Sequence, residues 1–293
     1  MNRVLIIGCG DVAMRVAPLI RQRYRLYGLV RNPARHQVLR DAGIIPLPGD
    51  LDDACSLHRL AGLAHVVLHF APPGSVGAKD QRTRNLLASL SRGRLPGRLI
   101  YISTSGVYGD YDGGHVSETD AVRPQSLRAQ RRVDAENQIR NWVKRNKVHA
   151  SILRVPGIYA ADRLPLDRIL SGTPAIVADE DSYTNHIHAD DLAAIVVRGL
   201  RYASLNRIYN ASDDSELKMG EYFDAVADAY DLPHPPRLPR AEVERTVSPA
   251  LWSFMNESRR LTNVRMKQEL KVTLRYPIVA DALAAITGRD SSS

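Results

Sequence analysis

The first half of the chain alternates short runs of β-branched and aliphatic residues with segments in which apolar residues recur every three or four positions. This alternation is typical of a parallel sheet whose strands are joined by helical crossovers. We therefore predict an α/β fold with a doubly wound parallel sheet over residues 1–155. The predicted strands cover Val4 to Ile7, Leu26 to Val30, Ile44 to Leu47, His65 to Phe70, Arg98 to Ser103 and His149 to Arg154.

After Arg154 the alternation weakens, and prolines, loops and short elements become more frequent. This change indicates that residues 156–293 form a smaller second region, from which residues 186–210 return to the first domain. We further predict a helix over Gln125 to Lys147, a helix over Asp190 to Tyr202, an extended connector over Leu232 to Arg240 and a frayed tail over Gly288 to Ser293.

A glycine-rich turn follows the first predicted strand and opens the first helix. Gly8, Gly10 and Ala13 fit a G-x-G-x-x-G/A pattern, in which they provide the tight turn, close backbone approach to a pyrophosphate and close helix packing. The phosphates would bind free N–H groups at the helix N-terminus. Asp11 is interpreted as an acid at the helix start, because a carboxylate would repel a phosphate. A bare turn is the alternative to a Rossmann-type dinucleotide site formed by Gly8, Cys9, Gly10, Asp11, Val12 and Ala13.

Two arginines follow the second predicted strand. In dinucleotide-binding sheets an acid near this point binds the adenosine ribose 2′-OH, whereas an arginine accommodates a 2′-phosphate. Arg31 stands where the acid would be, and Arg35 follows one turn later. These residues favour NADP(H) over NAD(H), with a solvated arginine as the alternative. Asp50 and Leu51, after the third strand, are predicted to face the adenine, although a plain turn explains them nearly as well.

The charge and composition limit the classes of partner. The chain has 40 Lys and Arg against 32 Asp and Glu, a formal net charge of +8. Its basic residues are scattered and not gathered into a stripe with interleaved aromatics, which disfavours nucleic acid as a partner. No apolar run approaches the ~18 residues that span a bilayer, and no signal-like segment is present, so we expect a cytoplasmic protein without membrane contact. Cys9 and Cys55 are too few for a disulfide framework or a cysteine metal site, and no metal-ligand spacing occurs.

Several further motifs extend through most of the chain. They are Gly49-Asp50-Leu51, Thr83 to Leu87 (TRNLL), Tyr101 to Gly109 (YISTSGVYG), Leu153 to Tyr159 (LRVPGIY) and Asn185 to Ala193 (NHIHADDLA). By these motifs the sequence resembles the extended short-chain dehydrogenase/reductases, the NAD-dependent epimerase/dehydratase family. The resemblance implies cofactor binding in the N-terminal sheet and substrate binding under a smaller C-terminal domain. It adds Phe70, Ala71, Pro72 and Ser103 to the expected cofactor contacts.

The family's catalytic residues are only partly present. The resemblance places its Ser/Thr at Thr104, four residues before the tyrosine of the VYG run. None of the twelve tyrosines is followed by a lysine four positions later, and alignment on Glu136 places Arg128 and Arg132 where the Tyr-x-x-x-Lys pair belongs. Arginine stays protonated and cannot transfer a proton near neutral pH. The two arginines could instead bind a cofactor or substrate anion, or lie on the protein surface.

A relocated proton donor is therefore considered. His188 matches a family His-x-x-Asp run with Asp191, which we interpret mainly as packing and capping at a helix start. The candidate donors are Tyr108, Tyr111, His115, Tyr159, His186 and His188.

Arg259 and Arg260 resemble a family segment that contacts substrate or a dimer partner. By analogy with the family, the segments Thr83 to Leu90 and Gln125 to Lys147 would form a homodimer contact.

Together these features predict an atypical short-chain dehydrogenase/reductase that binds NADP(H) and acts as an oxidoreductase or epimerase. Its substrate would be an unidentified small molecule, anionic if the arginines bind it, whose carbonyl Thr104 orients or polarises. Loss of the Tyr-Lys pair supports an alternative, a regulatory protein that senses NADP(H) without turnover. The net positive charge supports a further alternative, a role in RNA binding or processing.

Overall fold

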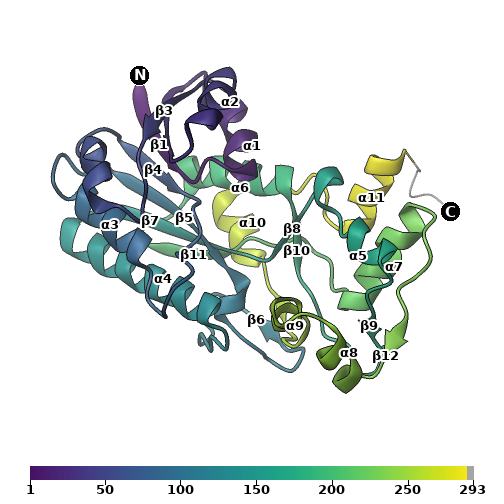
Figure 1. The fold of residues 1–293 in the computed structure, drawn as a ribbon. Helices are drawn as coiled ribbons and strands as arrows, with labels where there is room; N and C mark the ends of the chain where they lie inside the picture. Colours follow the sequence, from purple (N-terminus) through teal and green to yellow (C-terminus); the bar gives the residue numbers. More distant parts are fainter. Residues whose placement is uncertain (289–293) are drawn as a thin grey trace.

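The central feature of the protein is a seven-stranded parallel sheet, seen in a computed structural model that describes residues 1–288 (Figure 1). The prediction of six strands is wrong by one, because β11 joins the edge of the sheet. Its four residues, RIYN, include a single aliphatic side chain and so lack the apolar run that marks the other strands. In spatial order the strands are β11 (Arg207–Asn210), β7 (His149–Val155), β5 (Arg98–Thr104), β4 (Val66–His69), β1 (Asn2–Ile7), β2 (Tyr24–Val30) and β3 (Ile44–Pro48).

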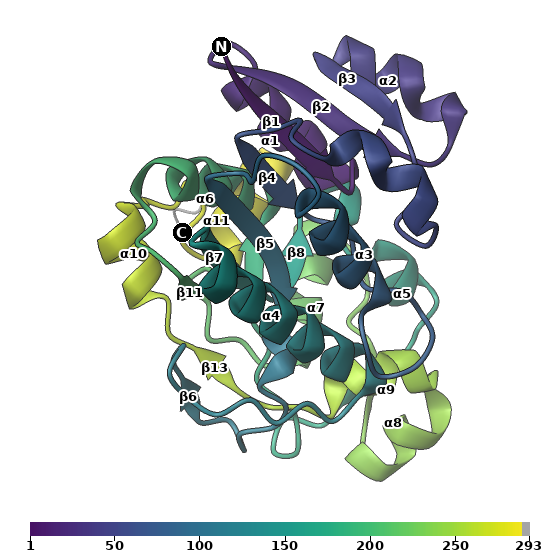
Figure 2. The ribbon, with the colours of Figure 1, turned by 90° about the vertical axis from the view of Figure 1, so that its left-hand side faces the viewer.

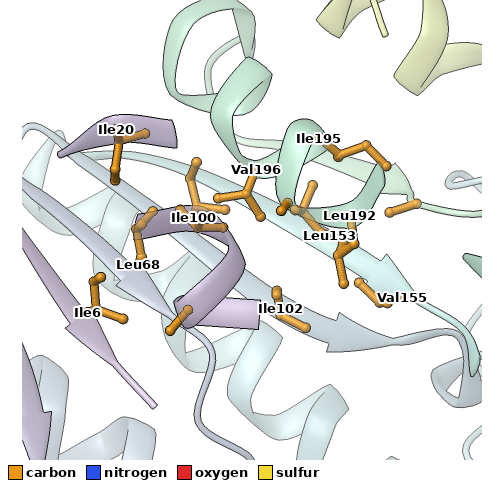
Figure 3. Close-up of a cluster of buried hydrophobic side chains, with 14 of the residues drawn as sticks. Ile6, Ile20, Leu68, Ile100, Ile102, Leu153, Val155, Leu192, Ile195 and Val196 are labelled. Atoms are coloured by element: carbon orange, nitrogen blue, oxygen red, sulfur yellow. The ribbon is translucent and has the colours of Figure 1, made fainter. Parts of the chain in front are cut away.

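Helices cover both faces of this sheet. Successive side chains of β1 point to opposite faces, so that Val4 and Ile6 pack in one apolar cluster and Leu5 and Ile7 in another. Figure 3 shows the first cluster between the sheet and two helices. The helices on this face are α1 (Asp11–Ile20), α6 (Ala189–Tyr202) and α10 (Val264–Leu270), with α2 (His36–Asp41) near β3. The helices on the other face are η2 (Ala54–Leu60), α3 (Gln81–Leu90) and α4 (Leu127–Asn146).

The strand order creates a crevice at one edge of the sheet. From β1 the chain builds outward to β2 and β3, then crosses back and builds β4, β5, β7 and β11 on the other side. The loops after β1 and β4 therefore diverge, and the carboxyl end of these strands is the usual ligand position in such sheets. Figure 2 shows α3 and α4 side by side across one face, and their use as a dimer contact stays a prediction.

A second group of elements has its own apolar cluster beside the sheet (Figure 1). The predicted connector Leu232 to Arg240 has no helix before its last residue. The C-terminal half is not one continuous unit, because α10 packs on the main sheet together with Val272 and Leu274. This second group contains α5 (Leu166–Leu170), α7 (Met219–Ala229), α11 (Val279–Thr287), α8 (Arg240–Thr246), α9 (Pro249–Met255), β9 (Ala175–Ile176) and β12 (Arg237–Leu238).

Short parallel pairs join the two parts of the molecule. β8 (Gly157–Tyr159) pairs with β10 (His186–His188), and β6 (His115–Val116) pairs with β13 (Arg260–Leu261). Within residues 1–288, no helix combines the length and apolar character needed to cross a membrane. Of the predicted tail, all but Gly288 lies outside the described residues.

Candidate functional site

The glycine-rich turn leaves room for a ligand at the N-terminus of α1. Gly8 has a φ of +93°, and a Cβ added there would lie 2.4 Å from the backbone nitrogen of Ala71. Only glycine therefore allows the turn to approach the loop after β4. Gly10 is the N-cap of α1, where no side chain caps the helix, and a Cβ there would meet nothing within 4 Å. Free N–H groups beside open space fit the pyrophosphate of a dinucleotide.

Five of the predicted cofactor residues line one cavity of about 220 Å³ at the carboxyl ends of β1, β2 and β4. They are Gly8, Arg31, Asp50, Leu51 and Ala71. The lining also includes Arg82, which the sequence analysis did not identify and whose guanidinium pairs with Asp52 at 2.6 Å. The remaining predicted cofactor residues are outside this lining: Cys9, Gly10, Asp11, Val12, Ala13, Arg35, Phe70, Pro72 and Ser103.

The two predicted phosphate-binding arginines differ in their surroundings. The Arg31 side chain is 71% exposed and lies 3.7 Å from an Asp50 carboxylate oxygen. Arg35 donates a hydrogen bond of 3.2 Å from Nη2 to the carbonyl oxygen of Cys9, so it supports the glycine-rich turn. Burial raises the pKa of the Cys9 thiol to about 12, which keeps it protonated. Asp11 forms ion pairs with Arg15 at 3.0 Å and Arg163 at 3.1 Å, in keeping with its interpretation as a helix-start acid.

A larger cavity, of about 320 Å³, lies beyond the end of β5. Thr104 ends that strand, and its Oγ1 accepts a hydrogen bond of 3.2 Å from Gly106 N, so the hydroxyl hydrogen remains available for a ligand. β8 and β10 contribute Tyr159 and His186 to the lining. Burial lowers the pKa of His186 to about 3 and keeps its ring neutral. The cavity therefore brings together residues 104, 128, 159, 186 and 259, which are far apart in the sequence.

Four of the candidate proton donors lie outside this cavity. Tyr108 is fully buried, and its hydroxyl donates to Asn210 at 2.7 Å. Burial raises the pKa of Tyr108 to about 12. His188 caps α6 through a hydrogen bond of 3.2 Å from Asp190 N to its Nδ1, and burial lowers its pKa. Tyr111 donates to Ala121 O, and His115 lies 3.8 Å from Glu216. Packing thus gives Tyr108 and His188 structural contacts in place of the proton-donor roles expected for them.

The two arginines at the start of α4, Arg128 and Arg132, differ in their contacts and in their position relative to the cavity. Arg132 donates from Nη1 to the Tyr101 hydroxyl at 3.0 Å and to the Ile102 carbonyl at 2.7 Å, and it is not part of the cavity lining. Arg128 lies at the exposed rim of the cavity, with its guanidinium 3.8 Å from the ring centre of Phe254. Only Arg128 is placed to meet a ligand in this cavity.

The other wall of the cavity comes from the second group of elements, and the sequence analysis missed its residues. No local pattern marks them, because they lie on short helices and loops whose packing brings them together only in three dimensions. Within residues 1–288 no group of three or more His, Cys, Asp or Glu side chains is arranged to hold a metal. The missed lining residues include Arg163, Arg168, Tyr183, Tyr222, Phe223, Phe254 and Glu257.

Sequence comparison matches residues 13–212 to the model of the NAD dependent epimerase/dehydratase family. A curated relative, methionine adenosyltransferase 2 subunit beta from Danio rerio, is 26% identical over 197 residues. The match covers 61% of this chain, and it spans 59% of the length of that relative.

Solved structures share the whole architecture. A functionally unknown conserved protein from Silicibacter pomeroyi has a TM-score of 0.80 and 26% identity, with 100% of both chains covered. UDP-glucuronic acid 4-epimerase from Bacillus cereus, solved in complex with NAD, has a TM-score of 0.76 and 17% identity, with 98% of this chain and 96% of that chain covered. At 17% identity, the likeness to the Bacillus cereus enzyme shows a shared fold.

Proposed function

Because the chain belongs to the NAD dependent epimerase/dehydratase family, we propose that it binds a nicotinamide dinucleotide and acts as an oxidoreductase or epimerase. The observation that carries this proposal is the open helix N-terminus at Gly10 beside the cavity that Gly8, Arg31 and Ala71 line. The larger cavity, beside Thr104, would hold the substrate. Both cavities lie at the carboxyl edge of the same sheet, so a ligand in one can meet a ligand in the other. The cofactor, when bound, donates or accepts a hydride.

We propose further that the cofactor is NADP(H). Arg31 supports this preference, because its exposed guanidinium is 3.7 Å from Asp50 and retains donors for a 2′-phosphate. Arg35 has a smaller part, since one of its donors already binds the Cys9 carbonyl. A charge-assisted contact contributes about 1.5 to 3 kcal/mol, or roughly 10- to 100-fold in affinity.

The test is to measure dissociation constants of NADP⁺ and NAD⁺ for the wild type and for Arg31→Ala. We expect the substitution to weaken NADP⁺ binding about 10- to 100-fold and to leave NAD⁺ binding unchanged. Arg40→Ala is the matched control, because Arg40 is an exposed arginine in the last turn of α2. Equal affinity of the wild type for the two cofactors would contradict the NADP preference.

We assign the proton transfer to Tyr183. Three tyrosines line the larger cavity, and two of them, Tyr159 and Tyr222, are at most 6% exposed, whereas Tyr183 is half-buried. The Arg260 guanidinium carbon lies 4.7 Å from the centre of the Tyr183 ring, and Lys218 Nζ lies 5.9 Å from it. Arg260 and Lys218 thus lie over the ring of the most exposed of the three tyrosines in this lining. Thr104 would orient the substrate carbonyl with its hydroxyl hydrogen.

A regulatory role is the second candidate function. Its support is the likeness to the Danio rerio relative, which is named as a subunit, together with the arginines at residues 128 and 132. Incubation of the protein with NADPH and a panel of aldehydes, ketones and sugar nucleotides separates the two functions. An enzyme oxidises NADPH with at least one member of the panel. A sensor oxidises it with none and binds the oxidised and reduced cofactors with different affinity.

A further inference from the structure

We propose that the larger cavity binds an oxyanion group of its ligand, a phosphate or a carboxylate, between Arg128 and Arg168. This inference rests on the proposed function only in treating the cavity as the substrate site. It specifies the substrate class as a small molecule that carries an oxyanion at one end and a carbonyl or hydroxyl group near Thr104 at the other.

Arg168 is a cation that forms no ion pair with any residue of the described part of the chain. Its guanidinium carbon lies 4.0 Å from the ring centre of Phe223, and Nη2 lies 3.2 Å from the sulfur of Met255. Nε is buried and has no hydrogen-bond partner. Within residues 1–288 the Arg168 side chain forms no ion pair, and burial lowers its pKa to about 10. A partly buried cation in this position is costly unless an anion accompanies it.

Arg128 has the same kind of environment at the rim of the cavity. Its guanidinium lies 3.8 Å from the ring centre of Phe254, and no ion pair or hydrogen bond connects its side chain to another described residue. Stacking occupies the flat face of a guanidinium and leaves its in-plane N–H groups free. Each arginine is thus held by an aromatic ring while its donors stay available.

The charges of the lining favour an anion. Four arginines line the cavity, against one carboxylate, Glu257. Arg163 pairs with Asp11 at 3.1 Å, and Arg259 pairs with Glu257 at 2.7 Å. Arg128 and Arg168 are therefore the two lining arginines that form no ion pair with another described residue.

The planar N–H donors of a guanidinium match the oxygens of carboxylates and phosphates. The two arginines should therefore prefer an oxyanion to a halide ion. The neutral ring of His186 and the hydroxyl of Thr104 supply uncharged hydrogen-bonding groups elsewhere in the same lining. The lining therefore offers both cationic and neutral polar groups, which suits one small ligand that carries both an oxyanion and an uncharged polar group.

Isothermal titration calorimetry of the full chain with inorganic phosphate, acetate and acetamide tests this site. Phosphate and acetate should bind, and acetamide, which has the shape of acetate without its charge, should not. Arg128→Met and Arg168→Met should each weaken anion binding about 10- to 100-fold. Arg140→Met is the control, because Arg140 is exposed on α4 and outside the cavity. Tighter binding of phosphate than of acetate indicates a phosphate-bearing substrate, and the reverse indicates a carboxylate.

Equal binding of acetate and acetamide would overturn the proposal, as would anion binding that survives both cavity substitutions or falls equally in the control. Thermal melting gives a second readout: phosphate should raise the Tm of the wild type and leave that of Arg168→Met unchanged. Arg128 lies on the exposed rim, so its variant tests the site even if Arg168→Met folds poorly.

Titration of the same proteins with NADP⁺ separates this proposal from the proposed function. Both cavity variants should bind NADP⁺ as the wild type does. If the wild type binds NADP⁺ but neither phosphate nor acetate, the oxyanion site alone is rejected. Phosphate binding at Arg128 and Arg168 without any NADP⁺ binding would reject the proposed function alone.

Discussion

Arg128 and Arg132 are one helical turn apart on α4, yet their partners give them different chemistry. Arg132 donates hydrogen bonds to Tyr101 and to the Ile102 carbonyl, and these contacts fix it against β5. Arg128 stacks on the ring of Phe254 and forms no hydrogen bond through its side chain within residues 1–288. A polar side chain whose donors are satisfied within the fold supports structure, whereas one without partners at a cavity is available for a ligand.

The same criterion leads to a prediction for Tyr183. We expect Tyr183→Phe to lower kcat about 10²- to 10⁴-fold in NADPH-dependent reduction of carbonyl compounds that carry phosphate or carboxylate groups, because the variant lacks the proton that the product oxygen takes up. Tyr111→Phe should keep its rate, since the Tyr111 hydroxyl donates to Ala121 O outside the cavity. An unchanged kcat in Tyr183→Phe would contradict this assignment.

Helix α4 owes its position to a buried ion pair. The carboxylate of Glu136 lies 2.8 Å from Arg154 of β7, and each side chain is 3% exposed. Ser103 of β5 donates to the same carboxylate at 2.6 Å. One acid thus connects α4 to two strands and places the first turn of the helix, with Arg128, at the rim of the cavity.

Substitution of Glu136 tests how much its ion pair with Arg154 contributes to the stability of the protein. Glu136→Gln should lower the free energy of unfolding by about 3 to 5 kcal/mol, because it leaves the Arg154 charge buried without a counterion. Urea denaturation measures the change. The double variant Glu136→Gln/Arg154→Met should recover much of the loss, since it removes the unpaired charge as well. A double variant as unstable as the single one would show that the pair is not the cause.

At the scale of the whole molecule, the second group of elements closes over the carboxyl edge of the sheet and buries polar groups there. Asp213 follows β11, donates its backbone N–H to the His186 carbonyl at 2.8 Å and is 3% exposed. Burial raises the pKa of the Asp213 carboxyl to about 8. The native protein therefore binds a proton at Asp213 that the unfolded chain releases near the ordinary aspartate pKa.

This raised pKa makes stability depend on pH. Between the unfolded pKa, about 4, and pH 8 the native state holds more protons at Asp213, so this group's stabilising contribution is complete below that range and is lost as the pH rises through it. We compare the free energy of unfolding of Asp213→Asn with that of the wild type. The difference, in favour of the variant, should grow from pH 5 to pH 8 by at most about 1.4 kcal/mol per pH unit and should change little above pH 8. Urea denaturation at pH 5, 7 and 9 provides the comparison. A constant difference between the two proteins would refute the raised pKa.

Local sequence determined the elements that carry the cofactor site. The run from Val4 to Ile7 directly before Gly8 specifies strand, turn and helix within a few residues. The place of Arg31 is predictable because it directly follows the next strand. Six of the seven strands of the sheet and the long α4 helix were predictable for the same reason, because their periodicity is contained in the segment itself. The edge strand β11 was not, since its residues, RIYN, include a single aliphatic side chain.

Tertiary structure alone decided which polar groups meet in the larger cavity and which remain unpaired. Arg163 pairs with Asp11, 152 positions away, whereas Arg168 packs on Phe223 and Met255 and forms no ion pair within the described residues. Sequence spacing cannot predict such pairings, because they depend on how short helices of the second group pack against the sheet. Burial then determines the chemistry: it keeps His186 neutral, and it leaves Arg168 a cation that an anionic ligand can pair with.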